Sequence, residues 1–283
     1  MIPTPILILG GEAGSGKDTV AALIQSYTKN TICIAQADPM KRFAAKVFGF
    51  TEHQLWGPSE ARNQSDLRFL NVDAWESARY QIENDSNGWI AEVLPDIGLD
   101  AQYDAQVALL EWFDNVRSSH CLLTTRWCGS PTGLTPRYVL QTLGTEWGRK
   151  FSPLMWNDYA IRAAKQLLVG GYDYNRLKGV IKADRGVPDY VIITDGRFAD
   201  EILASKMIGG VAIKIVNPNK SDDAKKVEVA GVKNHRSESE LKMIPDHFYD
   251  VKLINDKSHG MLALENKVQR LVSVLKKFDV LIA

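Results

Sequence analysis

The residues from Gly11 to Lys17 have the types and the spacing of a loop that holds phosphate groups. They meet the pattern G-x-x-x-x-G-K, and Asp18 and Thr19 follow directly. Glycines let successive backbone N–H groups turn toward phosphate oxygens, and a lysine adds a compact positive charge. The glycine spacing does not fit the dinucleotide-binding fingerprint. The pattern therefore predicts a site for the phosphates of a nucleoside triphosphate, with an ordinary glycine-rich turn as the alternative.

The segments on either side of this loop are those that such a motif requires. The apolar run at residues 6–9 predicts a buried strand. After the loop, apolar residues recur with the spacing of an amphipathic helix, at Val20, Leu23, Ile24 and Tyr27. A helix that starts at the loop points the positive end of its dipole at the phosphates. We expect phosphate contacts from Gly14, Ser15, Gly16, Lys17, Asp18 and Thr19.

Asp18 departs from the usual motif, which has Ser or Thr after the lysine so that a hydroxyl can bind magnesium. A carboxylate can hold Mg²⁺ directly or through water, because hard cations prefer oxygen ligands. It can equally favour the helix N-terminus through its charge alone. Asp18 is therefore the candidate magnesium ligand, and both interpretations stay open.

Further apolar, β-branched runs alternate with helical segments along the chain, at residues 32–35, 190–194, 211–216 and 249–254. This alternation predicts a doubly wound α/β fold with a parallel five-stranded sheet, whose ligands bind at the carboxyl ends of the strands. Asp195 and Arg197 follow the run at 190–194, where they can organise a metal ion and phosphate. The alternative is that Asp195 caps the next helix and Arg197 pairs with Asp200 or Glu201.

The middle of the chain is expected to be helical. Asp38 with Pro39, Thr51, and Thr135 with Pro136 each give a pattern that opens a helix. In the helix after Thr135, the inward face is expected to hold Val139, Leu143 and Trp147. The opposite stripe holds Arg137, Gln141, Gly144 and Gly148. Glycine in a helix costs about 1 kcal/mol relative to alanine, so the two glycines indicate close approach by either a ligand or another helix.

Acidic residues accumulate between Arg79 and Arg117, a segment without Lys or Arg. We interpret it as an inserted acidic lobe. Its periodicity predicts a packed helix with an apolar face at Val107, Leu110 and Phe113. An acidic surface repels phosphorylated ligands, so the active site is expected elsewhere.

The composition limits the classes of partner. The 34 basic and 34 acidic residues leave no excess positive charge for a nucleic-acid backbone, so no such partner is expected. No apolar run has membrane-spanning length and no leader peptide is recognised, so neither a membrane partner nor export is expected. The spacing of Cys33, Cys121 and Cys128 suits reduced thiols in a cytoplasmic protein.

The strings GSGKDT, ADPMKRFA, LWGPSEARN, TPRYVLQTLGTEWGR and ITDGRF carry a family resemblance. In their order and spacing the chain resembles the phage-type deoxynucleoside monophosphate kinases, over most of its length. The resemblance implies a P-loop kinase with a helical monophosphate-binding region and a lid. It implies transfer of the γ-phosphate of ATP, with magnesium, to a deoxynucleoside 5′-monophosphate in a cytoplasm, that of the host if a phage encodes the chain. A homodimer is kept as an option.

The resemblance also assigns residues. Gly14 to Thr19 hold the phosphates of ATP. The acceptor is assigned to Asp38, Lys41, Arg62, Arg137, Gln141, Gly144, Thr145, Trp156 and Asp195. Cations or carboxylates for the transfer itself are Lys17, Arg137, Asp195, Arg197 and Arg236, the last in the lid.

The predicted organisation is one P-loop kinase domain spanning 1–283. Residues 1–37 and 189–283 form the core, 38–170 the helical region with the acidic insertion at about 80–117, and 217–247 the lid. Another small-molecule P-loop kinase is the alternative. A GTP-dependent switch is suggested only by the N-K-x-D pattern at 219–222, and a nucleotide-binding protein without turnover is the third possibility.

Overall fold

The computed structural model describes residues 5–12, 14–125, 133–218 and 243–277. The chain divides into two compact units: residues 1–36 with 160–283 form unit 1, and residues 37–159 form unit 2. The predicted single domain thus contains two compact units. The predicted helical region, 38–170, extends beyond unit 2 because the boundary falls inside one helix, α9 (Met155–Leu167), whose later residues pack in the core of unit 1.

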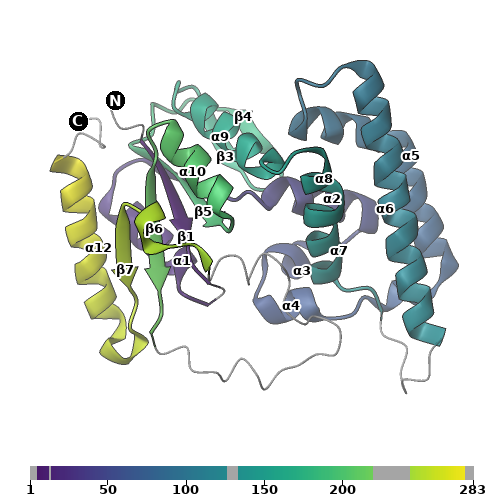
Figure 1. Ribbon diagram of the computed structural model, residues 1–283, viewed down its shortest axis with the longest axis horizontal. Coiled ribbons are helices and arrows are strands. Elements are labelled where there is room, and N and C mark those ends of the chain that lie inside the picture. The colour runs from purple at the N-terminus through teal and green to yellow at the C-terminus, as the bar shows by residue number, and fades with distance from the viewer. Residues whose placement is uncertain (1–4, 13, 126–132, 219–242, 278–283) are drawn as a thin grey trace. The chain divides into compact units, whose positions relative to one another are not determined.

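Unit 1 is built on a parallel sheet, which has five strands in the part of the chain described. Their order is β2-β5-β1-β6-β7, and every neighbouring pair is parallel (Figure 1). The strands are β1 (Ile6–Gly10), β2 (Thr31–Ile34), β5 (Tyr190–Gly196), β6 (Val211–Val216) and β7 (Val251–Ile254). The structure confirms the predicted α/β class and the five-stranded parallel sheet.

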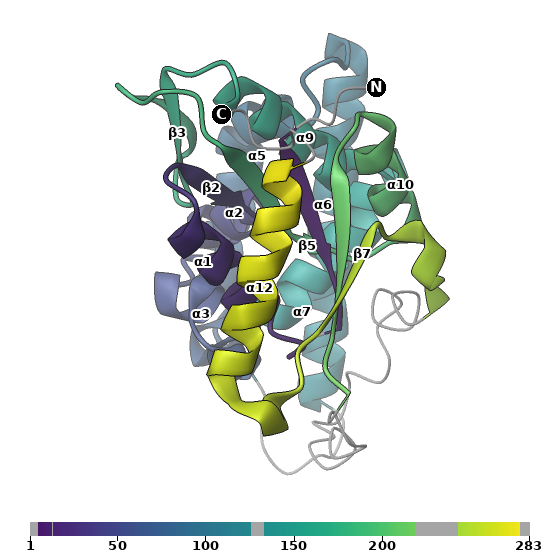
Figure 2. The same ribbon diagram turned by 90° about the vertical axis from the view of Figure 1, so that its left-hand side faces the viewer.

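Helices cover both faces of this sheet. On one face, α1 (Lys17–Tyr27) and α12 (Gly260–Lys277) pack against Leu7, Ile192 and Ile213 (Figure 2). On the other face, α10 (Ala199–Met207) and the later part of α9 pack against the alternate residues of the same strands. Because both faces are buried, the strands are apolar throughout, and this is why short apolar runs located them in the sequence.

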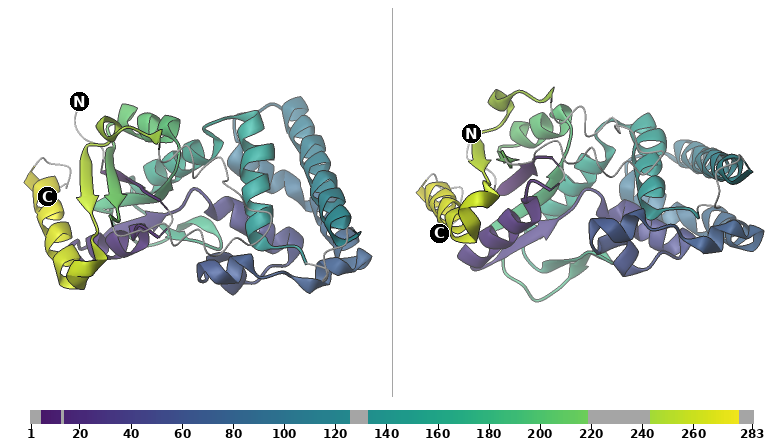
Figure 3. Two further views of the ribbon diagram at one scale, coloured as in Figure 1. Left: turned by 60° about the horizontal axis from the view of Figure 1, so that its bottom comes forward. Right: turned by 90° about the horizontal axis from the view of Figure 1, so that it is seen from below.

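The strand order has a consequence for ligand binding. β1 and β6 are neighbours, yet the strand that follows β1 in the chain, β2, lies on one side of this pair and the strand that follows β6, β7, lies on the other. Figure 3 shows the ribbon from two further sides. In open α/β sheets, ligands bind where neighbouring strands diverge in this way, beyond their carboxyl ends. The loop from Gly11 to Lys17 begins at this point.

Unit 1 also has short elements outside the sheet. β3 (Tyr172–Asn175) and β4 (Gly179–Lys182) form an antiparallel hairpin that the sequence patterns did not predict. The 3-10 turns η4 (Asp246–Phe248) and η5 (Lys257–His259) flank β7. Across the described ranges, no helix combines the length and apolarity needed to cross a bilayer.

Unit 2 is helical, as predicted. Its elements in chain order are α2 (Asp38–Phe48), α3 (Glu52–Trp56), α4 (Ser59–Asn63), η1 (Leu67–Leu70), α5 (Val72–Val93), α6 (Leu99–Thr125), α7 (Pro136–Thr142), the π-helix η2 (Leu143–Gly148) and α8 (Arg149–Phe151). They enclose an aromatic core in which Trp89 contacts Phe43, Trp147 and Trp156, with ring centroids 4.3, 5.0 and 6.2 Å apart.

All three predicted helix starts are confirmed, and two of the three predicted caps are. Thr51 forms a complete capping box with Gln54, and the Thr135 side chain accepts the backbone N–H of Tyr138. The predicted cap at Asp38 is wrong, because Asp38 is already the first residue of α2. Its carboxylate instead accepts the indole N–H of Trp56 at 2.9 Å, a tertiary contact that no local pattern could reveal.

The acidic segment is not a separate lobe. Its helices α5 and α6 pack against each other and supply much of the buried core of unit 2. Some of its acidic side chains pair with the flanking base Arg79, as in Arg79–Asp114 at 2.6 Å and Arg79–Glu83 at 2.9 Å. Of the predicted apolar face, Phe113 is buried but Val107 is exposed; Leu109 and Trp112 are buried instead, because α6 packs on α5 along a different stripe.

The glycine stripe of the helix after Thr135 is used for packing. A Cβ at Gly148 would overlap the ring of Trp156, and one at Gly144 would lie 3.0 Å from the sulfur of Met40. Val139, Leu143 and Trp147 form the inward face as predicted. The π-helix at Leu143–Gly148 interrupts the α-helical period, so that Gly144 and Gly148 are buried as well.

Candidate phosphate-binding site and the predicted acceptor residues

The loop between β1 and α1 has the backbone of an anion-binding turn. Gly14 and Gly16 have φ values of 76° and 96°, the left-handed region that glycine enters without strain. α1 begins at Lys17, and among the described side chains none caps its N-terminus. The N-terminus of α1 therefore presents the positive end of the helix dipole to the loop, which favours an anion there.

The Lys17 ammonium group folds back over the loop. It donates to the carbonyl oxygen of Gly11 at 2.5 Å and to that of Glu12 at 3.0 Å. These bonds hold one positive charge beside the loop backbone, where the motif predicts the outer phosphates of a nucleotide. A lysine held in this way is a point charge for phosphate oxygens.

Asn255 directly follows β7 and contacts the loop through its side chain. Its side-chain amide donates to the Ser15 carbonyl oxygen at 2.8 Å, and its backbone N–H donates to Val216 at 2.8 Å. A Cβ at Gly16 would overlap this amide nitrogen. Sequence reasoning missed Asn255, although a polar residue directly after an apolar strand is a signal for the carboxyl edge of a parallel sheet.

Asp18 is exposed on the first turn of α1. No group of three or more metal-binding side chains gathers anywhere in the described ranges. Magnesium that arrives with a nucleotide needs only one or two protein carboxylates besides phosphate oxygens and water, so Asp18 fits that more limited task. Its interpretation as a magnesium ligand stays a prediction.

The surroundings of Cys33 on β2 change the pKa of its thiol. Burial, with a smaller contribution from the Asp18 carboxylate, raises the pKa of the Cys33 thiol to about 12. The folded chain keeps this thiol protonated at alkaline pH, whereas the unfolded chain ionises it above about pH 8.5. The contribution of Cys33 to stability is therefore present below that pH and is lost as the pH rises toward 12.

We therefore expect an alkaline difference between the wild type and Cys33→Ala. Between pH 7 and pH 10, the wild type should lose about 1–2 kcal/mol more of its free energy of unfolding than the variant does. Urea unfolding at both pH values measures this. The packing lost with the sulfur cancels, because it is absent from the variant at both values. An equal loss in both proteins would mean that Cys33 ionises normally in the fold.

Asp195 and Arg197 lie at the end of β5, as predicted. Asp195 does not cap the next helix: its carboxylate accepts the backbone N–H of Gln36 at 2.7 Å, which ties the end of β5 to the segment after β2. The residue that supports the start of α10 is Glu201, whose carboxylate accepts the N–H groups of Arg197 and Phe198. The Arg197 side chain is exposed and has no ion-pair partner among the described residues.

In unit 2, the predicted acceptor arginines lie around the short helix α4. Arg137 donates to the Asn63 side chain and, at 2.6 Å, to the Ser59 hydroxyl. Arg62 belongs to α4 itself and donates to the Gly57 carbonyl oxygen at 3.0 Å. Both side chains are half-buried. Because α4 and α7 are in contact, Arg137 binds side chains of the helix that carries Arg62, although 75 residues separate the two arginines in the chain.

Asp38 and Lys41 lie on the first turn of α2. The Lys41 ammonium is 3.9 Å from the Asp38 carboxylate and 5.6 Å from the centre of the Trp56 ring. Asp38 is buried, so its bond from Trp56 fixes the carboxylate. The first turn of α2 therefore carries a carboxylate and an ammonium group side by side, next to the Trp56 ring.

The remaining residues that were predicted to bind the acceptor differ in how far they are exposed. Gln141 and Thr145 are half-buried, whereas Gly144 and Trp156 are buried. The indole N–H of Trp156 donates to the Gly144 carbonyl oxygen at 3.0 Å. The structure therefore uses Trp156 and Gly144 for packing between helices. Arg236 and most of the predicted lid, like the N-K-x-D pattern, lie outside the described residues.

Comparisons with known protein families and curated proteins identified no relative of this chain. The chain matches no protein-family model, and a search of curated proteins found no match either.

Proposed function

We propose that this protein is an ATP-dependent deoxynucleoside monophosphate kinase. In this proposal unit 1 binds ATP at the loop from Gly11 to Thr19. Unit 2 binds the deoxynucleoside 5′-monophosphate near Arg62 and Arg137. The products are ADP and the deoxynucleoside diphosphate.

One observation carries the proposal: the loop after β1 combines left-handed glycines, a helix starting at Lys17, and a lysine held over the loop. Anion binding needs convergent N–H donors and positive charge, and this loop offers both. The place of the loop at the point where β1 and β6 diverge supports a nucleotide ligand.

In phosphoryl transfer, the protein itself contributes little covalent chemistry. The rate enhancement comes from positioning the acceptor in line and from cations around the transferred group. Lys17 supplies a charge at the loop, and Arg137 orients the acceptor phosphate. Magnesium, when bound with ATP, neutralises charge on the β- and γ-phosphate oxygens. Asp18 and Asp195 are the carboxylates of unit 1 that fit its hydration shell.

A coupled assay of ADP release tests the proposal. The protein is given ATP and magnesium with each common deoxynucleoside monophosphate and ribonucleoside monophosphate in turn. We expect release that depends on the acceptor and is fastest with at least one deoxynucleotide. ATP binding without stimulation by any monophosphate would reject the proposal in favour of a kinase for another small acceptor. Release from GTP alone would instead favour the switch protein.

Arg137→Ala should act on the acceptor alone. We expect kcat/KM for the monophosphate to fall about 100-fold, because a bidentate charge-assisted contact to phosphate is lost. The rise in melting temperature caused by ATP should stay unchanged. Steady-state kinetics and thermal unfolding with ATP measure the two effects.

Asn63→Ala is the matched control for Arg137→Ala. It removes a partner of the guanidinium but keeps the guanidinium itself. Its activity should stay near that of the wild type. Equal loss in both variants would show that Arg137 serves only to hold α4.

A further inference from the structure

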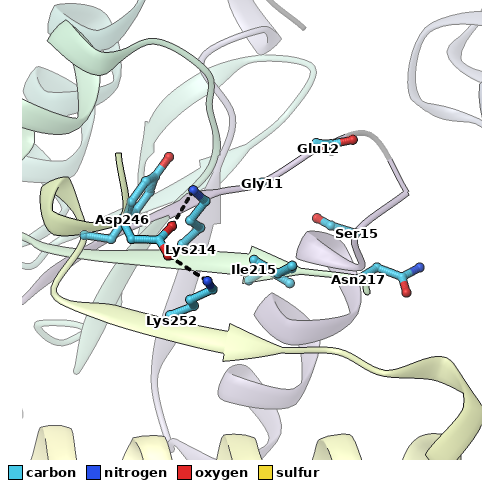
Figure 4. Close-up of a pocket in the computed structure, with 10 residues that line it drawn as sticks. Gly11, Glu12, Ser15, Lys214, Ile215, Asn217, Asp246 and Lys252 are labelled. Atoms are coloured by element: carbon cyan, nitrogen blue, oxygen red, sulfur yellow. Dashed lines mark hydrogen bonds and ion pairs between the residues drawn. The ribbon is translucent and has the colours of Figure 1, made fainter. Parts of the chain in front are cut away.

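A cavity of about 360 Å³ opens beside the phosphate loop in unit 1 (Figure 4). Its wall includes Gly11, Glu12 and Ser15 after β1, and residues 214–217 at the end of β6. The rest of the wall comes from Asp246, Tyr249 and Lys252. The cavity therefore lies where β1 and β6 diverge, which is the favoured place for a ligand in such a sheet. Lys17 does not line it.

Two lysines meet at one end of this cavity. Lys214 on β6 and Lys252 on β7 are direct neighbours in the strand register. Both donate to the Asp246 carboxylate, at 2.7 and 2.6 Å (Figure 4). These hydrogen bonds lower the pKa of Asp246 to about 2, so the carboxylate is ionised throughout the neutral range. The Asp246 carboxylate thus occupies the position on the two lysines that a bound oxyanion would take.

The lysine pair keeps donors that Asp246 does not use. An ammonium group has three N–H donors. Lys214 also donates to the Ile244 carbonyl oxygen, and Lys252 has no further partner in the described part of the chain. The other acidic residue of the wall, Glu12, lies at the far end of the cavity with its side chain directed away from the lysines. The charge at the lysine end is therefore positive.

Two buried hydroxyl groups on the wall have no hydrogen-bond partner within the described ranges. Tyr249 is 7% exposed and Ser15 is 1% exposed. Because Gly10 and Gly11 lack side chains, these hydroxyls can approach the end of β1: a Cβ there would lie 2.6 Å from the Tyr249 hydroxyl and 2.8 Å from that of Ser15. Native proteins seldom leave buried hydroxyls unpaired, but these two oxygens have almost no accessible surface and do not face the open space of the cavity.

We propose that the lysine end of this cavity, beside the phosphate loop, is a second anion site, which takes a phosphate-type oxyanion on Lys214 and Lys252 in exchange for Asp246. The oxyanion accepts the spare ammonium donors of the two lysines. The occupant is either free phosphate or the phosphate group of a nucleotide. This site needs no kinase activity, so it stands independently of the proposed function.

Phosphate titration of isotope-labelled protein tests this site by NMR. The amide signals of Val251–Ile254 report binding, at constant ionic strength. A Lys17→Ala background weakens binding at the loop and leaves the lysine pair intact. In this background Lys252→Gln should weaken phosphate binding about tenfold, which corresponds to one charge-assisted hydrogen bond. Asp246→Asn should strengthen it by several fold, because the competing carboxylate is gone.

Lys276→Gln on α12 is the control for a general loss of positive charge, and it should leave the affinity unchanged. Equal affinities in the Lys252 and Asp246 variants would overturn the proposal. Adding ATP to protein with an intact Lys17 distinguishes the two possible occupants, free phosphate and the phosphate group of a nucleotide. Displacement of phosphate by ATP identifies a nucleotide phosphate as the occupant, and simultaneous binding identifies a free anion. An inactive kinase assay would leave these results unaffected.

Discussion

Replacement of Lys17 by alanine is expected to lower kcat/KM for phosphate transfer by about 100- to 1,000-fold, the usual effect of removing one donor to a charge that develops in the transition state. The ammonium is held over the loop by the carbonyl oxygens of Gly11 and Glu12. No other lysine lies within the loop motif. The coupled ADP assay with the best acceptor measures the loss.

The same variant should lose most of the increase in melting temperature that ATP causes in the wild type. Binding to the folded state alone produces this increase, so it reports ATP affinity without turnover. Lys29→Ala, at an exposed position after α1, is the control and should behave as the wild type. A Lys17 variant with unchanged transfer would show that the loop does not hold the reacting phosphates.

The second large effect is expected on stability, from Gly11→Ala. Gly11 has a φ of 152°, and an added Cβ would overlap the backbone carbonyl oxygen of Ile215 on β6. A backbone atom in a central strand cannot move aside as a side chain can. We expect the free energy of unfolding to fall by about 2–4 kcal/mol, from overpacking and backbone strain together. Urea unfolding without ligand measures it.

Gly14→Ala separates the two causes. Gly14 also has a positive φ, 76°, but an added Cβ would meet nothing within 4 Å. It should therefore lose only the cost of left-handed backbone, about 1–2 kcal/mol. Losses of the same size in both variants would mean that contact with β6 is unimportant and that backbone strain alone explains the requirement for glycine.

Local patterns were sufficient for the elements that carry the loop. The strand at residues 6–10 and the helix from Lys17 depend on apolar spacing and glycine content over a few residues, and both were predicted. The same holds for the capping box at Thr51 and the inward face at Val139 and Trp147. Such features follow from interactions between residues close in the chain, which a sequence displays directly.

Predictions failed where packing partners are distant. The face of α6 was misplaced because α5 selects which of its residues are buried. The glycines of the helix after Thr135 left two interpretations open, and only the position of the Trp156 ring decided between them. Asp38 was expected to cap a helix, but the indole of Trp56 takes its carboxylate.

By itself, then, the sequence determined the α/β class and the glycine-rich loop between a strand and a helix, together with the residue types from which phosphate chemistry is predicted. Only the tertiary structure decided the strand order that aligns β1 with β6 and the bond from Asn255 to Ser15, 240 residues apart in the chain. It also decided the meeting of Lys214, Lys252 and Asp246. The reason is physical: these contacts depend on which strands pair, and strand pairing minimises the free energy of the whole sheet rather than that of any one segment.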